Sequence, residues 1–204
     1  MGYILTILGA YLLGCSNMAM YLAKAKNVSL SGGSGNPGTS NATLLMGWRA
    51  GILVGIHDIG KGVLAVLLSE LIFTELAYVG AVAGVACVLG HIFPVFMKFR
   101  GGKGFASFIG MTLALNWKFA LIILAVVVVV TLLTDYIVVG TVTTVVATPV
   151  AMGFLTHSMI LVGIICVATA VILYKHRENF PRILNGTEIG LRSAIRGDNK
   201  LDKK

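Results

Sequence analysis

Long apolar stretches, separated by short polar breaks, run through almost the whole of this chain. The 204 residues are 57% hydrophobic and only 12% charged, with a mean hydropathy of +0.91. Because a water-soluble protein needs about a quarter of its residues charged, most of this surface must face lipid. A bilayer is crossed by roughly twenty apolar residues in a helix. The pattern therefore predicts an all-α membrane protein with about seven transmembrane helices, in a single multi-pass domain over residues 1–204.

The seven predicted spans cover residues 2–23, 50–73, 76–97, 105–116, 117–134, 136–155 and 158–174. The fourth span is short, so it is either re-entrant or continuous with a neighbour. The first has no basic region before it and is long enough to cross, which argues against a cleaved signal peptide.

The basic residues indicate the orientation. Fourteen of the 16 Lys and Arg fall in residues 24–49, residues 98–103 and the basic tail of residues 175–204. An odd number of spans places these three segments on one side, and the positive-inside rule makes that side cytoplasmic. We expect a cell-membrane protein with its N-terminus outside and its C-terminus in the cytoplasm. The net charge is +8, but the basic residues lie between and after the apolar runs. This distribution argues against binding of nucleic acid.

Residues 91–104 read His-Ile-Phe-Pro-Val-Phe-Met-Lys-Phe-Arg-Gly-Gly-Lys-Gly. The cations Arg100 and Lys103 can neutralise an anion, and the glycines allow backbone amides to approach a phosphate. A nucleotide P-loop would need Ser or Thr at Gly104 and a preceding strand, so that interpretation fails. A basic loop that only fixes topology would leave the glycines and His91 unexplained.

Two further segments have similar chemistry. Residues 31–41 form an uncharged loop rich in glycine, hydroxyl and amide groups, which is either a flexible linker or a phosphate-binding loop. Residues 175–188 follow the last span, and there His176 and Asn179 share one polar helix face. The alternative to a site at this face is a basic patch that only binds anionic lipid.

Ionisable residues also lie inside the second span. Asp58 and Lys61 are three residues apart and can pair on one helix face. Such groups are costly in a membrane, and a structural ion pair and a pair that lines a site are both possible. We expect His57 to be only a polar neighbour. The three cysteines lie in apolar surroundings, and no metal or other cofactor is expected.

The three loop segments resemble the three cytoplasmic motifs of the bacterial integral-membrane acyl-phosphate:glycerol-3-phosphate acyltransferases. The resembling stretches are residues 33–41, residues 91–104 and residues 175–188, and the spacing of spans and motifs also agrees. The family implies attack of the 1-hydroxyl of glycerol 3-phosphate on an acyl phosphate, giving lysophosphatidate and phosphate. The partners would be these two substrates and the bilayer; the oligomeric state is left open.

The resemblance implies roles for particular residues. His91, Lys103 and His176 are the catalytic candidates, although the base is either a histidine or a substrate phosphate oxygen. The substrate-binding candidates are Ser34, Gly35, Asn36, Asn41, Lys61, Arg100, Gly101, Gly102 and Asn179.

The sequence departs from the family at three positions. Leu44 stands where an arginine is usual, Val138 where a serine is expected, and Asp135 where a basic residue is expected. These changes would permit a weak enzyme with a changed acceptor, or a scaffolding protein. An anion or phosphate-ester transporter is a further alternative, against which stands the lack of an internal repeat. A soluble-type acyltransferase is excluded, because no histidine is followed five residues later by Asp.

Overall fold

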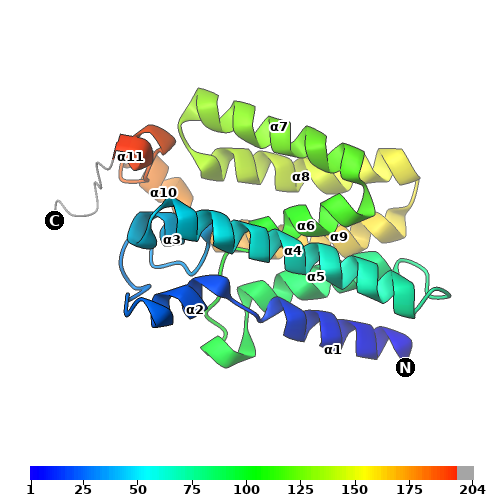
Figure 1. The fold of residues 1–204 in the computed structure, drawn as a ribbon. Helices are drawn as coiled ribbons and strands as arrows, with labels where there is room; N and C mark the ends of the chain where they lie inside the picture. The colour runs from blue at the N-terminus through cyan, green and yellow to red at the C-terminus, as the bar shows by residue number, and fades with distance from the viewer. Residues whose placement is uncertain (197–204) are drawn as a thin grey trace. The chain divides into compact units, whose positions relative to one another are not determined.

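The computed structural model describes residues 1–196, and all the regular structure within them is helical. Two compact parts, residues 1–117 and residues 118–204, are distinguished by their internal contacts. Figure 1 shows the helices in chain order. Lys200, Lys203 and Lys204, which belong to the predicted basic tail, lie outside the described residues.

The first part contains six α-helices and one short 3-10 helix. They are α1 (Gly2–Gly14), α2 (Met18–Ala25), α3 (Thr39–Met46), α4 (Trp48–Ile72), α5 (Val79–Ile92), η1 (Val95–Met97) and α6 (Phe105–Leu115).

Small residues let these helices pack closely. Helix α1 packs along α5, and α4 along α6. A Cβ at Gly14 would overlap the carbonyl oxygen of Cys87, and one at Gly110 would overlap that of Ile59. Lipid tails are as apolar as leucine, so helices in a membrane gain mainly from such close backbone packing. These two contacts hold α1 against α5 and α4 against α6.

A break interrupts the first predicted span. Helix α1 ends at Gly14, and α2 begins at Met18 with Asn17 as its N-cap, whose side chain accepts a hydrogen bond from Met20 N. The backbone carbonyls at the end of a helix lack intrahelical partners. The break therefore leaves the Ser16 carbonyl able to accept a hydrogen bond from another element.

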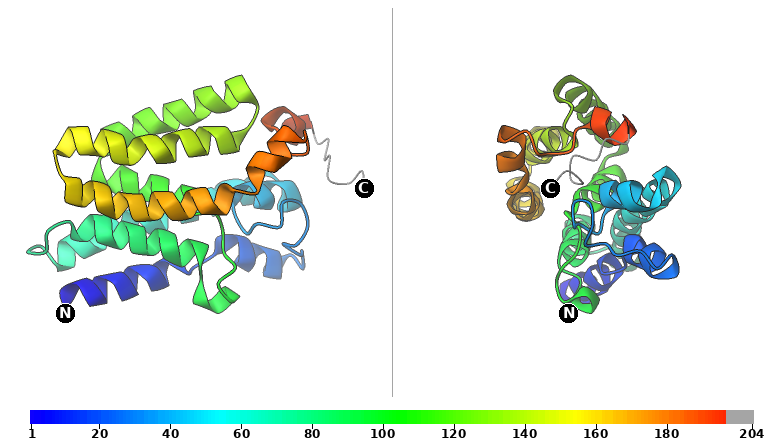
Figure 2. Two further views of the ribbon diagram at one scale, coloured as in Figure 1. Left: turned by 180° about the vertical axis from the view of Figure 1, so that it is seen from behind. Right: turned by 90° about the vertical axis from the view of Figure 1, so that its left-hand side faces the viewer.

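The second part consists of three long helices followed by two short ones. They are α7 (Trp117–Thr134), α8 (Ile137–Thr156), α9 (Met159–His176), α10 (Asn179–Leu184) and α11 (Leu191–Arg196). Helix α8 packs on α9, where Thr169 Oγ1 donates to Val145 O at 3.2 Å. Figure 2 shows α10 leaving the end of α9 at an angle.

Six segments of the described chain are long and apolar enough to cross a membrane. They are Gly2–Ala25, Trp48–Ile72, Val79–Met97, Trp117–Thr134, Ile137–Thr156 and Met159–His176. Helix α6 has 11 residues, so it is about 16 Å long, which is short for a bilayer core. The all-α multi-pass membrane fold is thus confirmed, and the fourth predicted span is short, as expected; the number of crossings and their orientation stay predictions.

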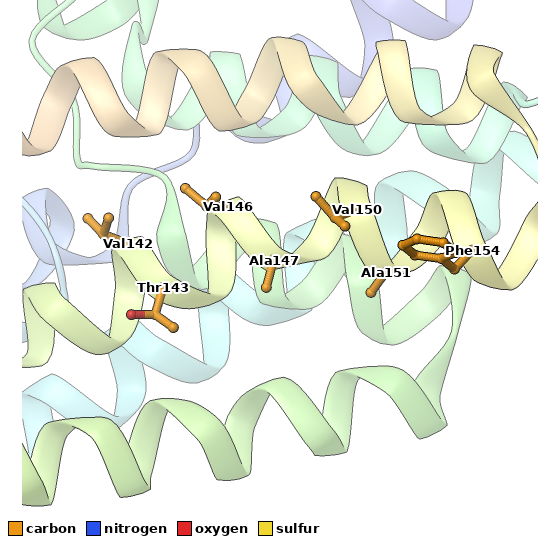
Figure 3. Close-up of a pocket in the computed structure, with 7 residues that line it drawn as sticks. All are labelled: Val142, Thr143, Val146, Ala147, Val150, Ala151 and Phe154. Atoms are coloured by element: carbon orange, nitrogen blue, oxygen red, sulfur yellow. The ribbon is translucent and has the colours of Figure 1, made fainter.

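An apolar groove of about 630 Å³ runs along α8. Figure 3 shows Thr143, Ala147 and Ala151 on the side of α8 that faces α7. The lining residues are Val142, Thr143, Val146, Ala147, Val150, Ala151 and Phe154, and none of them is a predicted site residue. This composition suits contact with lipid chains and offers no chemistry for phosphate.

Candidate functional site

Two buried asparagines hold the loop that joins α2 and α3. The Asn41 amide nitrogen donates to Leu30 O at 3.1 Å, and its oxygen accepts from Ser34 N at 2.8 Å. Asn17 Nδ2 donates to Pro37 O at 3.2 Å. Both side chains are almost completely buried. Because buried polar groups must be paired, these bonds give the glycine-rich loop one defined shape, which a flexible linker would not have.

This loop leads directly into an uncapped helix N-terminus. Gly38 is the N-cap of α3 and supplies no side-chain hydrogen bond, and the first amide bonded within the helix is that of Ala42, to Gly38 O. The N–H groups of the first turn therefore face outward, and with the helix dipole they favour an anion. Sequence reasoning missed this feature, although a glycine followed by Thr and Ser is a possible signal for it.

The residues of this loop that were predicted to bind phosphate do not all face outward toward a ligand. The side chain of Asn41 and the amide of Ser34 bond to each other, so these two atoms hold the loop. Ser34 and Asn36 are half-buried and Gly35, in a left-handed conformation, is exposed. Contact of Ser34, Gly35 and Asn36 with phosphate stays a prediction, whereas the side chain of Asn41 supports the loop.

A buried cluster of charged and polar groups lies between α4 and α5. Lys61 Nζ is 2.9 Å from Asp58 Oδ1, 2.8 Å from His91 Nδ1 and 2.7 Å from Ser16 O. His91 Nδ1 is 3.4 Å from Asp58 Oδ1. The exposed fractions of Asp58, Lys61 and His91 are only 2–3%. The predicted ion pair of Asp58 and Lys61 is present, and it contacts the histidine of the second motif.

His57 has a larger part in this cluster than the sequence suggested. Its Nδ1 lies 3.3 Å from Asp58 Oδ1, and its Nε2 lies 2.9 Å from Ser16 Oγ. His57 is thus a polar neighbour of Asp58, as expected, and it also links Asp58 to Ser16. Ser16 was missed altogether, because nothing in the sequence marks the break at which its carbonyl becomes available.

The second motif folds back onto the end of α5. Gly101 N donates to Ile92 O and Gly102 N to His91 O, both at 3.1 Å. A Cβ at Gly101 would overlap the His91 carbonyl oxygen, and one at Gly102 would overlap His91 Nε2. The prediction that the glycine amides form a nest for phosphate fails at these two N–H groups, because they bond to helix carbonyls. The glycines instead allow the loop to pack directly on His91.

Two cations of this loop, Arg100 and Lys103, stand directly before and after the glycine pair. Lys103 is half-buried, whereas Arg100 is exposed. Gly104 adopts a φ of +89°, which is left-handed and favours glycine, and it begins α6. Lys103 is thus held between the loop packed on His91 and the first turn of a helix.

In the second part, the third motif forms its own hydrogen bonds. His176 Nδ1 donates to Ile172 O at 2.8 Å, and Asn179 Nδ2 donates to Glu188 Oε1 at 2.6 Å. Both His176 and Asn179 are buried. Glu188 Oε2 is also buried and has no hydrogen-bond partner within residues 1–196. Glu188 was part of the quoted motif but was not predicted as a site residue.

The three positions that depart from the family pattern have distinct surroundings. Leu44 is half-buried on α3, and Val138 is buried on α8. Asp135 anchors the C-terminal segment, since its Oδ1 accepts from Arg192 N at 2.8 Å and its O accepts from Leu191 N at 2.7 Å. The acidic residue at position 135 therefore holds the start of α11.

Comparison with known proteins gives consistent matches over nearly the whole chain. The family model described as glycerol-3-phosphate acyltransferase matches residues 4–186. A glycerol-3-phosphate acyltransferase of Thermoanaerobacter sp. (strain X514) is 35% identical over 197 residues, which cover 95% of this chain and 98% of the relative. One of Coxiella burnetii (strain CbuG_Q212) is 37% identical over 193 residues, covering 92% and 97%.

Solved structures agree. The glycerol 3-phosphate form of PlsY (YgiH), an integral membrane glycerol 3-phosphate acyltransferase, matches with a TM-score of 0.87 and 32% identity, over 93% of this chain and 96% of that one. The lysophosphatidic acid form of PlsY matches with a TM-score of 0.86 and 31% identity, over 96% and 99%.

Proposed function

Because this chain belongs to the glycerol-3-phosphate acyltransferase family, we propose that it transfers a fatty acyl group from acyl phosphate to the 1-hydroxyl of glycerol 3-phosphate. The observation that carries the proposal is the likeness to the glycerol 3-phosphate form of a solved family member, which extends over 93% of the chain. The protein is a multi-pass membrane acyltransferase, and the product is lysophosphatidate, the first acylated intermediate of phospholipid synthesis.

The reaction requires little covalent chemistry from the protein. The hydroxyl oxygen of glycerol 3-phosphate forms a bond to the acyl carbonyl carbon, and the bond from that carbon to the phosphate oxygen breaks. The hydroxyl proton goes to an oxygen of the departing phosphate. An acyl phosphate already has a good leaving group, so the main tasks are to bring two mutually repelling anions together and to neutralise their charge.

The first part supplies two kinds of group for these anions. The outward N–H groups at the start of α3 suit a phosphate, with Ser34, Gly35 and Asn36 in the loop before them. Lys103 and Arg100 supply positive charge within the second motif. A charge-assisted hydrogen bond is about twice as strong as a neutral one, so such contacts hold a phosphate well. Gly101, Gly102 and Asn41 contribute by shaping these loops.

In the second part, His176 and Asn179 are proposed to orient substrate. His176 Nδ1 donates to the helix backbone, which fixes the orientation of the imidazole ring. Asn179 is held by Glu188. We place the reaction at the cytoplasmic face of the cell membrane, which is supported by the distribution of 14 of the 16 cations.

The test is an assay of purified protein in lipid with acyl phosphate and glycerol 3-phosphate, following phosphate release and the lipid product. Lysophosphatidate should form in equal amount to phosphate, without acyl-CoA. Activity with acyl-CoA alone would contradict the proposed donor. Movement of glycerol 3-phosphate across sealed vesicles without acylation would instead indicate a transporter.

A further inference from the structure

All three N–H donors of the Lys61 ammonium group have a nearby acceptor. It has three acceptors within 3 Å, namely Ser16 O, His91 Nδ1 and Asp58 Oδ1. A lysine ammonium has three N–H donors and no acceptor. Each donor therefore has one partner, and the number of protons matches the number of acceptors.

This arrangement decides where the protons lie. All three N–H donors of the Lys61 ammonium have acceptors, and the carboxylate of Asp58 lies nearer to Lys61 than to His91. The proton shared between Lys61 and His91 therefore belongs to Lys61. His91 Nδ1 must then be unprotonated, because an N–H there would point at another N–H. The ring of His91 is neutral, with its only proton on Nε2.

The other nitrogen of the ring faces the second motif. A Cβ at Gly102 would overlap His91 Nε2, so the ring edge lies against the loop that carries Lys103. Within residues 1–196 no hydrogen bond satisfies Nε2, and the ring is only 3% exposed. Nε2 is not one of the fully enclosed unpaired atoms of that part of the chain, so this edge of the ring keeps a small opening. The position therefore suits an acceptor oxygen that arrives with a ligand.

We propose that Lys61 is a positioning residue that fixes His91 as a neutral hydrogen-bond donor through Nε2–H, aimed at an anionic oxygen of the substrate. This inference rests on the proposed function for the identity of the ligand, but the state of the ring follows from the cluster itself. His91 gives up no proton in the reaction. The hydroxyl proton passes directly from glycerol 3-phosphate to the departing phosphate, and Nε2–H stabilises charge on the oxygen that it contacts.

The first experiment measures the ring nitrogens directly. Nitrogen-15 NMR of histidine-labelled protein in lipid distinguishes a protonated from an unprotonated ring nitrogen, and His91→Gln assigns the signal among four histidines. We expect a neutral His91 with its proton on Nε2. In Lys61→Met, Asp58 becomes the remaining partner of Nδ1, so the proton should move to Nδ1. A wild-type His91 that is protonated on Nδ1 would overturn the proposal, whether or not the protein is an acyltransferase.

The second experiment uses turnover and leaves the charges of the cluster unchanged. Glutamine carries its amide nitrogen at about the position of Nε2, and asparagine at about that of Nδ1; neither can act as a base. His91→Gln should retain activity within about tenfold of wild type. His91→Asn and His91→Ala should lose a further ten- to hundredfold, the range for a hydrogen bond to a charged group. The control, His157→Gln, changes an exposed histidine and should leave turnover unchanged.

Equal loss in the Gln, Asn and Ala variants, each with an intact fold, would mean that His91 acts as a base or serves only packing, and the proposal would be wrong. Binding of glycerol 3-phosphate without turnover in wild type would count against the proposed function, while the NMR result would still decide the state of His91.

Discussion

A Cβ at Gly33 would overlap the side-chain oxygen of Asn41, which accepts the amide proton of Ser34 at 2.8 Å. Gly33 has no side chain, and this leaves the space that the buried amide of Asn41, eight positions later, needs to close the loop. The relationship explains why the first motif needs both a glycine and an asparagine: the glycine makes room for the group that closes the loop.

Gly33→Ala should therefore destabilise the loop more than Gly35→Ala. Both glycines have a left-handed φ, +60° and +68°, so alanine costs about 1 kcal/mol at either position. Only at Gly33 would the new Cβ also displace Asn41, whereas at Gly35 the nearest atom is Ser31 O at 3.8 Å. Loss of the buried hydrogen bond adds about 1–3 kcal/mol. Thermal unfolding in detergent measures the difference, and equal shifts in Tm would contradict the proposed role of Asn41.

Lys103→Met should lower turnover about ten- to hundredfold, the range for a charge-assisted contact to phosphate. Lys118→Met is the matched control, because it removes the same charge from an exposed position at the start of α7 and should be nearly neutral. Initial rates at saturating and limiting glycerol 3-phosphate measure both variants. Similar losses would show that the effect is general electrostatics of the membrane surface.

The predicted orientation can be tested by cysteine labelling. On a Cys166→Ser background, the exposed positions Ser31, Lys98 and Glu178 should react with a membrane-impermeant reagent only from the cytoplasmic side. Glu75→Cys, in the loop between α4 and α5, should react only from the outside. If any of the first three is labelled from outside, the seven-span orientation is incorrect.

Much of the fold could be predicted because lipid makes a strong demand on sequence. Each helix long enough to cross has a high mean hydropathy, so runs such as residues 117–134 and 158–174 are visible directly. The break after Gly14 could not be seen, because residues 15–17 are too few to interrupt an apolar average. Its consequence, the free carbonyl of Ser16 beside Lys61, was therefore also hidden.

The candidate site was predictable in its residue types but not in their roles. Spacing on one helix indicated the pair of Asp58 and Lys61, since three residues make nearly one turn. That His91 joins them depends on how α5 packs against α4, which is a tertiary contact. The glycines of the second motif suggested phosphate, but their amides bond to the end of α5. Glycine signals a close approach of the backbone and does not say what is approached.

Leu44→Arg should improve binding of glycerol 3-phosphate. Leu44 occupies the position at which the family usually has arginine, and it lies on α3, whose first-turn amides are the proposed phosphate ligands. Arginine binds phosphate through two parallel hydrogen bonds, which leucine cannot replace. Arg49 is a poor substitute, because it is exposed on α4 and its guanidinium lies 5.4 Å from the centre of the Trp48 ring. We therefore expect a high KM for glycerol 3-phosphate in wild type.

The KM of Leu44→Arg should be lower by several-fold or more, with a larger gain at low salt if the new contact is partly exposed to solvent. Leu45→Arg is the control, since it adds the same charge one position along α3 and on a different face of the helix. An equal gain in both variants would indicate a general attraction of the substrate to positive charge. If wild type already binds glycerol 3-phosphate tightly and Leu44→Arg weakens that binding, Leu44 does not mark a missing phosphate ligand, and the acceptor of this enzyme is a less anionic alcohol.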